Sequence, residues 1–199
     1  MSDNTPTRSL SDRIDAAVRA YDADQNVGRL LDCVRDAARD AGVEDLVRVA
    51  EPYRERLEIV IPLYEEIVRQ RPHDARAIVT LANAYWLTGR GPDVVGELAL
   101  RACNADPENR GAWHLWALAE SDVRARVERW RDVARRFPAD QLARAALADN
   151  AASLAGAEHD PLALDLAVTT YEGLLVEATS ATQKRALEHT LDVLRGWKI

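Results

Sequence analysis

The 199-residue sequence is poor in the residues that build disulfide-rich, loop-rich or membrane-spanning proteins. Its two cysteines, Cys33 and Cys103, have no C-x-x-C spacing, so we expect reduced thiols packed as small apolar residues rather than a disulfide scaffold. Glycine (9) and proline (8) are scarce, which argues against an all-β protein rich in turns. The longest apolar run, residues 59–63, is far shorter than the ~20 residues that cross a bilayer.

The opening segment MSDNTPTRSLSDR has no apolar stretch of the kind that a secretory signal requires, so we expect a cytoplasmic protein without a membrane segment. Hydrophobic residues make up 47% of the chain, which is too many for a disordered protein. The net charge of −7 argues against nucleic acid as a partner. Arginine outnumbers lysine by 24 to 2, a bacterial-like composition typical of a GC-rich genome.

What is present is a helical hydrophobic pattern along nearly the whole chain. Leu57, Ile61, Tyr64 and Val68, for example, recur at intervals of three and four residues. No segment alternates apolar and polar residues over the length of a strand. The pattern predicts an all-α protein with helices near residues 10–22, 26–41, 43–51, 53–70, 75–88, 92–104, 110–120, 122–136, 141–155, 161–178 and 181–197.

Capping signals support these boundaries. Ser9 with Asp12, and Ser180 with Gln183, have the spacing of capping boxes at helix starts. We expect three glycines to end helices in the left-handed conformation, and these are Gly42, Gly89 and Gly156. Pro52 leaves open whether residues 43–70 form one kinked helix or two helices.

A repeat is visible in the prolines between helices. Pro72 and Pro107 are 35 residues apart, and Pro107 and Pro138 are 31 residues apart. Helix–turn–helix units of about 34 residues are typical of repeat proteins in which each unit buries its apolar face only by stacking on the next.

One unit carries a specific residue pattern. Counted from Ala75 as position 1, the following residues occupy positions 4, 7, 8, 11, 15, 20 and 24: Ile78, Leu81, Ala82, Tyr85, Gly89, Val94 and Leu98. After one inserted residue, Ala102 and Pro107 fill positions 27 and 32. This unit resembles the tetratricopeptide repeat (TPR). The units that begin at Arg110 and Gln141 are looser matches; in the first of them, Glu120 stands where the family has tyrosine.

The resemblance implies a right-handed α-α superhelix of helical hairpins over residues 52–180. Residues 1–51 show no repeat match and are expected to add N-terminal helices. Residues 181–199 are expected to form a C-terminal capping helix with Leu187, Leu191, Leu194 and Trp197 facing inward. We expect these segments to form one continuous domain.

The resemblance also implies a concave groove that is lined by the first helices of the repeats. The groove positions provide candidate partner-binding residues: Arg76, Val79, Thr80, Asn83, Trp86, His114, Leu118 and Asp149. Arg76 and Asn83 could hydrogen-bond a peptide, and Trp86 could anchor an apolar side chain. The alternative is that Trp86 packs between repeats. Because only Asn83 and Arg76 could join the carboxylate clamp of the chaperone-binding members, a chaperone tail is not the expected ligand.

The helix at 122–136 carries six arginines, which indicate either a patch for an acidic partner or a solvated face of internal ion pairs. Glu128 and Asp132 interrupt the run and lie four residues from Arg124 and Arg136, respectively. This spacing favours the self-paired face.

Nothing in the sequence indicates catalysis or a cofactor. The four histidines lie on separate predicted elements, so no two of them are spaced as ligands of one helical metal site, and no nucleophile motif or glycine-rich phosphate loop is present. We therefore expect a non-catalytic scaffold that binds a protein or peptide, with no metal or cofactor. The alternative is a structural subunit that assembles with itself or within a larger complex.

Overall fold

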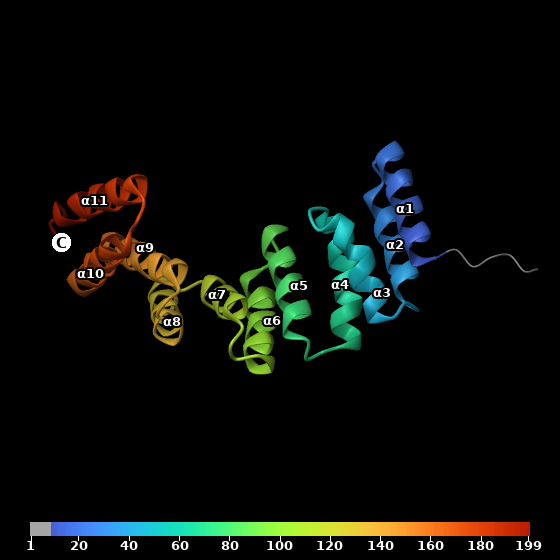
Figure 1. The fold of residues 1–199 in the computed structure, drawn as a ribbon, viewed down its shortest axis with the longest axis horizontal. Coiled ribbons are helices and arrows are strands. Elements are labelled where there is room, and N and C mark those ends of the chain that lie inside the picture. The colour runs from blue at the N-terminus through green and yellow to red at the C-terminus, as the bar shows by residue number, and fades with distance from the viewer. Residues whose placement is uncertain (1–8) are drawn as a thin grey trace, which may run out of the picture. The chain divides into compact units, whose positions relative to one another are not determined.

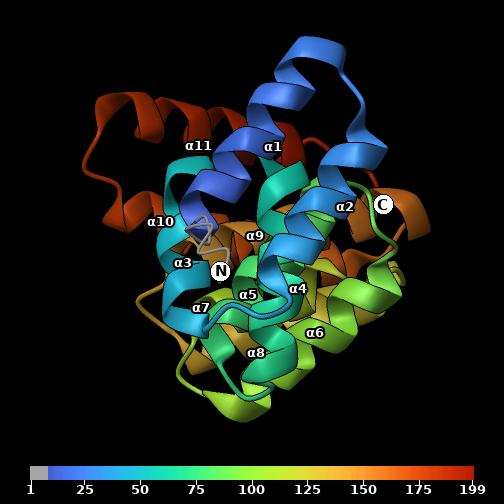
Figure 2. The same cartoon turned by 90° about the vertical axis from the view of Figure 1, so that its right-hand side faces the viewer.

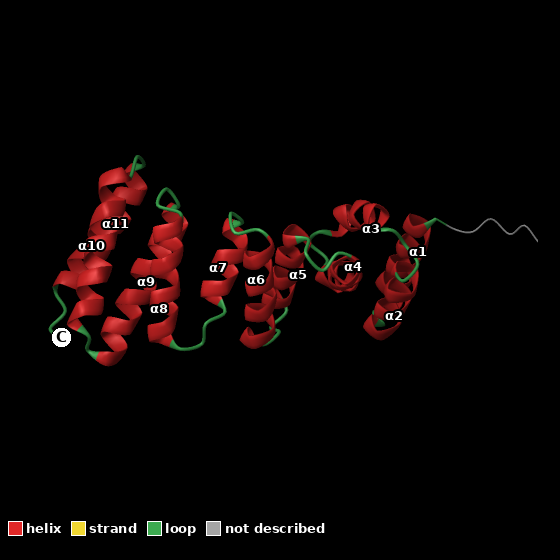
Figure 3. Ribbon diagram, turned by 90° about the horizontal axis from the view of Figure 1, so that it is seen from below, coloured by secondary structure: helices red, strands yellow, loops and turns green. Residues whose placement is uncertain are grey.

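The computed structural model describes residues 9–199 of the chain. Residues 1–8 lie outside this part. They include most of the opening segment on which the expectation of no secretory signal rests. Within residues 9–199 every regular element is a helix (Figure 3). The helices are α1 Leu10–Asp24, α2 Val27–Ala38, α3 Val43–Ala50, α4 Leu57–Gln70, α5 Ala75–Leu87, α6 Pro92–Ala105, α7 Arg110–Leu118, α8 Val123–Arg136, α9 Gln141–Glu158, α10 Pro161–Glu177 and α11 Ala181–Arg195. The predicted all-α class is confirmed.

The open question at residues 43–70 is settled in favour of two helices. A short 3-10 helix, Glu51–Tyr53, separates α3 from α4 and contains Pro52, whose ring fixes the backbone between them. The two helices pack against each other as a hairpin. Of these two helices, only α4 lies within residues 52–180, the range in which the sequence predicts repeats.

Two of the three expected glycine ends are wrong. Gly89 has the predicted left-handed φ of 74° after α5. Gly42 instead precedes α3 as its N-cap with φ of −73°, so it begins a helix rather than ending one. Gly156 lies inside α9, which continues to Glu158. The residue that caps this helix is His159, which has the left-handed φ of 53°. The expectation for the thiols also holds only in part, because Cys103 is buried and Cys33 is exposed.

The chain divides into two compact units, residues 1–112 and residues 113–199, and the boundary falls within α7. In the first unit, α1 and α2 lie side by side as an antiparallel pair (Figures 1 and 2). The second helix of this pair packs on α4, and α4 packs on the α5–α6 hairpin. The boundaries predicted from the sequence at residues 51/52 and 180/181, and the single continuous domain, remain predictions.

The core of the first unit is made of aliphatic side chains from successive helices. Its largest fully buried members are Ile14, Leu30, Val34, Leu46, Ile59, Leu63, Ile67, Ile78 and Val95. Each comes from the apolar stripe of its helix, as the period of three and four residues predicts. Because α5 contributes Ile78 and Leu81 to this core, its opposite face is held outward.

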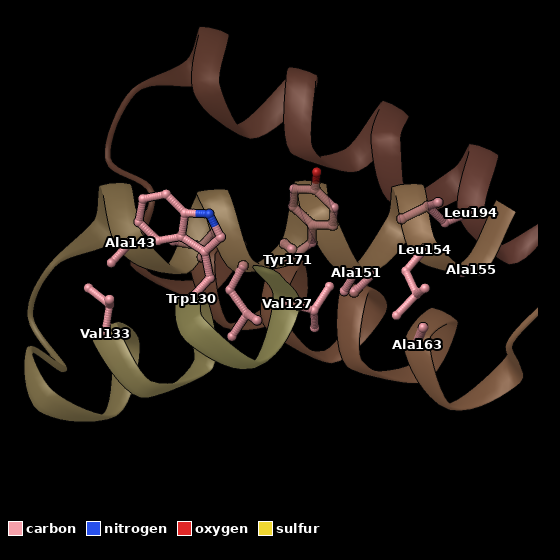
Figure 4. Close-up of a cluster of buried hydrophobic side chains, with 14 of the residues drawn as sticks. Val127, Trp130, Val133, Ala143, Ala151, Leu154, Ala155, Ala163, Tyr171 and Leu194 are labelled. Atoms are coloured by element: carbon pink, nitrogen blue, oxygen red, sulfur yellow. The ribbon is translucent and has the colours of Figure 1, made fainter. Parts of the chain in front are cut away.

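The core of the second unit contains larger side chains interleaved with alanines (Figure 4). Trp130 and Val127 of α8, Leu154 of α9 and Tyr171 of α10 are buried together. The alanines of α9 and α10 let these two helices approach closely along their length. Leu191 and Leu194 bury one side of α11 as expected, whereas Trp197 remains 37% exposed, with its ring against Gly156.

Candidate partner-binding face

The outward face of α5 is fixed by its cap and by its buried side. Asp74 caps the helix by accepting a hydrogen bond from the backbone N–H of Ala77 at 3.1 Å. On the buried side, Tyr85 donates its phenolic hydrogen to Glu65 of α4 over 2.7 Å. Burial first, and then this hydrogen bond, raise the pKa of Tyr85 to about 12. The hydrogen bond ties α5 to α4 and so fixes which side chains of α5 face outward.

That outward face holds five of the eight candidate residues at intervals of three and four: Arg76, Val79, Thr80, Asn83 and Trp86. The structure therefore brings these five together on one helix. We call them the α5 face. Trp86 is 37% exposed, and Leu87 beside it is 63% exposed, so the end of the face is apolar and open to solvent.

The side chains of the α5 face differ in whether they already have a partner within the chain. Among residues 9–199, the side chains of Arg76 and Asn83 have no hydrogen-bond or ion-pair partner. The hydroxyl of Thr80 donates to the backbone oxygen of Arg76 at 3.0 Å, so its hydrogen is used within the helix. Val79 is half-buried against Gly111 at the start of α7. Polar atoms that are available to a ligand are thus concentrated at Arg76 and Asn83.

The other three candidates belong to the second unit, and two of them have internal partners. His114 Nε2 lies 2.8 Å from Asp140 Oδ2, and its ring packs edge-on against Trp130. Asp149 accepts a hydrogen bond from the hydroxyl of Tyr171. Leu118 is exposed at the end of α7. Burial and the hydrogen bond to Asp149 raise the pKa of Tyr171.

Sequence reasoning missed these internal partners, because they lie 26 and 22 residues from the side chains they bind. The one available signal is the N-cap position of Asp140, directly before α9, where an aspartate accepts backbone hydrogen bonds. A buried cap carboxylate attracts a second donor, and here that donor is His114.

The arginines of α8 are held mainly by contacts with other elements. Arg124 binds Glu158 and Asp160 at the α9–α10 turn rather than Glu128, the partner that the spacing predicts. Arg129 donates to the backbone oxygen of Trp116 and pairs with Glu120, the residue at the position where the repeat pattern has tyrosine. Arg126 donates to Asn150 of α9 and to the backbone oxygen of Glu120. Two i,i+3 pairs lie within α8 itself, Arg131 with Glu128 and Arg135 with Asp132.

Neither a metal centre nor a membrane span is found in the part of the chain that the structure describes. No three histidine, cysteine, aspartate or glutamate side chains in it are grouped so that they could hold a metal ion. None of its helices is both long enough and apolar enough to cross a membrane.

Comparison with known proteins identifies the fold. No family model matches the sequence, and no curated protein sequence matches it. Among solved structures, TTC0263, a thermophilic TPR protein of Thermus thermophilus, is similar over 92% of this chain and 99% of its own, with a TM-score of 0.56 and 15% identity. Two structures of MamA are similar over 84% and 87% of this chain and 90% and 97% of their own, with TM-scores of 0.57 and 0.58 and identities of 15% and 11%.

These similarities show that the chain has a TPR-like fold. The resemblance inferred from the unit at residues 75–108 is thereby confirmed at the level of structure. At such low identity, the fold alone carries over from these proteins.

Proposed function

We propose that the chain is a non-catalytic scaffold that binds a peptide segment of a protein partner through the α5 face. The observation that carries the proposal is an exposed tryptophan, Trp86, on the same helix face as two polar side chains without internal partners among residues 9–199, Arg76 and Asn83. Exposed aromatic and arginine side chains are the residue types that dominate binding energy at protein interfaces.

The spacing of these side chains suits an extended peptide. Arg76 and Trp86 are ten residues apart on a helix that rises about 1.5 Å per residue, so their Cα atoms are separated by about 15 Å along its axis. An extended peptide covers that distance with about five residues. Arg76 and Asn83 supply donors for peptide carbonyl groups, and Trp86 with Leu87 supplies an apolar end for one side chain of the partner.

The test compares the wild-type chain with the double variant Asn83→Ala/Trp86→Ala in capture from native lysate. Both substitutions are at exposed positions, so the variant should fold, which circular dichroism can verify. A matched control is Leu100→Ala, which removes an exposed apolar side chain from α6. We expect the double variant to lose a partner that the wild type and the control retain. A partner captured equally by all three proteins would contradict the proposal.

A photo-crosslinking residue at position 86 then identifies what contacts the face. We expect crosslinks to the captured partner from position 86 and none from the same residue at position 100. Equal crosslinking from both positions would show that the α5 face is not the binding surface.

The second candidate is a structural subunit that assembles with itself. It is favoured by exposed apolar side chains in the second unit, above all Val176 at 87% and Leu162 at 78% exposed, both on α10. Light scattering of the purified chain decides between a monomer of 22.1 kDa and a larger assembly. A purely monomeric chain at high concentration would exclude this candidate.

A further inference from the structure

The two units contain the same surface groove in two versions. In the first unit it lies between α4 and α6, with a volume of about 450 Å³, and in the second it lies between α8 and α10, with a volume of about 510 Å³. Lining residues from α4, the turn after it and α5 correspond to lining residues from α8, the turn after it and α9. Each pair differs by 66 in residue number: Glu65 with Arg131, Val68 with Ala134, Arg69 with Arg135, Pro72 with Pro138 and Leu81 with Leu147.

The opposite walls, which belong to α6 and α10, also correspond, with a difference of 72 in residue number. There, Glu97 pairs with Thr169, Leu98 with Thr170 and Arg101 with Gly173. The α9–α10 hairpin has the longer first helix, since α9 has 18 residues and α5 has 13, so the second helices do not keep the difference in residue number of the first ones. The correspondence means that differences between the two linings can be compared position by position.

In the first unit, long side chains occupy the α4–α6 groove, and its charges are mixed. Arg101 reaches across to the backbone oxygen of Pro72 at 3.4 Å, and Glu65 holds the hydroxyl of Tyr85. Two glutamates and two arginines line this groove, so its formal charges cancel. Its balanced charges do not favour an ion of one sign.

In the second unit, the α8–α10 groove is open and positively charged. Gly173 replaces Arg101, and a Cβ atom placed on it would meet nothing within 4 Å, so no side chain crosses the groove there. Thr169 replaces Glu97, and Arg131 replaces Glu65. With Arg135 and Arg144, this lining has three guanidinium groups and no carboxylate.

Each of these arginines has a carboxylate partner outside the lining, and two of the three pairs are weak. Arg131 pairs with Glu128 and Arg135 with Asp132, three residues away on solvated helix surface, where ion pairs contribute little to stability. Arg144 is more firmly held by both oxygens of Glu177, yet its Nε is a buried donor with no partner in the described chain. Arg131 and Arg135 can therefore turn to an anionic ligand at little cost.

We propose that the α8–α10 groove binds an acidic peptide segment of a partner, with carboxylates on Arg131 and Arg135 and an apolar side chain on the floor. The floor is formed by Ala134, Pro138 and Leu147, which are all apolar. Planar guanidinium groups match carboxylates in two-point hydrogen bonds. The site lies in a different unit from the α5 face and does not depend on the function proposed for that face.

The test uses the full-length chain, labelled with ¹⁵N, and a short acetylated peptide of alternating glutamate and leucine. Amide spectra recorded during titration report both the affinity and the place of binding. We expect shifts in α8, in the turn around Pro138 and in α10, and weaker binding at higher salt. The same peptide with glutamine in place of glutamate should cause no saturable shifts.

Gly173 offers a matched pair of variants. Gly173→Arg introduces the side chain that crosses the α4–α6 groove and should weaken peptide binding about ten-fold or more. Gly173→Ala adds only a methyl group and should weaken binding far less than Gly173→Arg does. In the first unit, Arg101→Ala opens the α4–α6 groove but leaves Glu65 and Glu97 in place, so it should not create a second binding site.

Several outcomes would overturn the proposal. These are unchanged binding by Gly173→Arg, equal binding of the glutamine peptide, or shifts that map to α5 instead. Free glutamate or inorganic phosphate that binds as tightly as the peptide would mean a small-anion site and would also refute it. The double variant at Asn83 and Trp86 should bind the acidic peptide normally, so a failure of either proposal can be told from a failure of the other.

Discussion

At the scale of single residues, the fold favours the neutral form of four tyrosines. Burial raises the pKa of Tyr53, Tyr64, Tyr85 and Tyr171, and all but Tyr64 also donate a hydrogen bond to a carboxylate of another helix. The pKa reaches about 12 for Tyr53 and Tyr85. These phenol groups therefore link the ionisation of the chain to its folding.

The first prediction follows from the sign of these shifts. A group whose pKa is higher in the folded state than its ordinary value of 10.0 stabilises the fold fully below pH 10, and that stabilisation is lost as the pH rises toward about 12. We expect the free energy of unfolding to fall between pH 10 and pH 12, and Tyr85→Phe to show a smaller fall. Urea unfolding across this range measures both, and a curve of equal slope for the variant would contradict the prediction.

The second prediction concerns Asp140, the buried cap of α9. It accepts hydrogen bonds from the backbone N–H groups of Leu142 and Ala143 and holds His114. Removal of a cap alone costs about 1 kcal/mol, and the loss of a buried partner adds about 1–2 kcal/mol. Asp140→Ala should therefore destabilise the second unit by about 2–3 kcal/mol in chemical unfolding.

Asp122 provides the matched control, because it caps α8 in the same unit from an exposed position. Asp122→Ala should cost only about 1 kcal/mol. If the two variants were equally unstable, the contact between His114 and Asp140 would contribute nothing to the fold.

At the scale of helices, substitutions at two glycines can distinguish the effect of helix propensity on stability from the effect of packing. Gly173 in α10 and Gly156 in α9 are both exposed and both helical, but a Cβ at Gly156 would lie 3.3 Å from the ring of Trp197. Gly173→Ala should stabilise the second unit by about 0.5–1 kcal/mol, since alanine loses less backbone entropy than glycine in a helix. Gly156→Ala should gain less, because the ring must shift.

This third prediction is tested by making both glycine substitutions in the Trp197→Ala variant. Without the ring, Gly156→Ala should stabilise as much as Gly173→Ala does, as judged by thermal unfolding midpoints. A persistent difference between the two glycines would show that something other than Trp197 limits the gain.

Helices and their order were predictable from this sequence, whereas several contacts between helices were not. The helix pair α5–α6 follows from local signals: Asp74 before it, Gly89 within its turn and Pro107 after it. Each predicted helix end lies within four residues of the observed one. The prediction for Gly156 is wrong because α9 continues to Glu158. Leu154 and Ala155 beside it belong to the same apolar cluster as Leu191 of α11, and no short-range pattern predicts such a cluster.

The candidate site divides in the same way. Residues on one helix, such as Arg76 and Asn83, share a face because helical spacing alone decides it. The partners of His114 and Asp149 depend on how separate helices pack, which no short-range spacing encodes. Arg124 shows the same limit, since it binds Glu158, 34 residues away, in preference to the nearby Glu128.

At the scale of the whole molecule, the division into two units predicts that stability is local. Leu147 is buried in the core of the second unit, and Leu147→Ala should cost about 2–5 kcal/mol. In repeat proteins such a loss is felt mainly by nearest neighbours. Amide hydrogen exchange should therefore accelerate in α8, α9 and α10 while protection in α2 and α4 is retained. Equal acceleration in both units would show that the chain unfolds as one cooperative body.

The contrast between the two thiols has a practical consequence. Cys33 is exposed on α2 in the first unit, and Cys103 is only 3% exposed. A maleimide fluorophore should therefore attach to the native chain at one position, and mass spectrometry should find a single adduct on the peptide that contains Cys33. The natural sequence can thus be tethered or made fluorescent through a helix outside both the α5 face and the α8–α10 groove, without a single engineered residue.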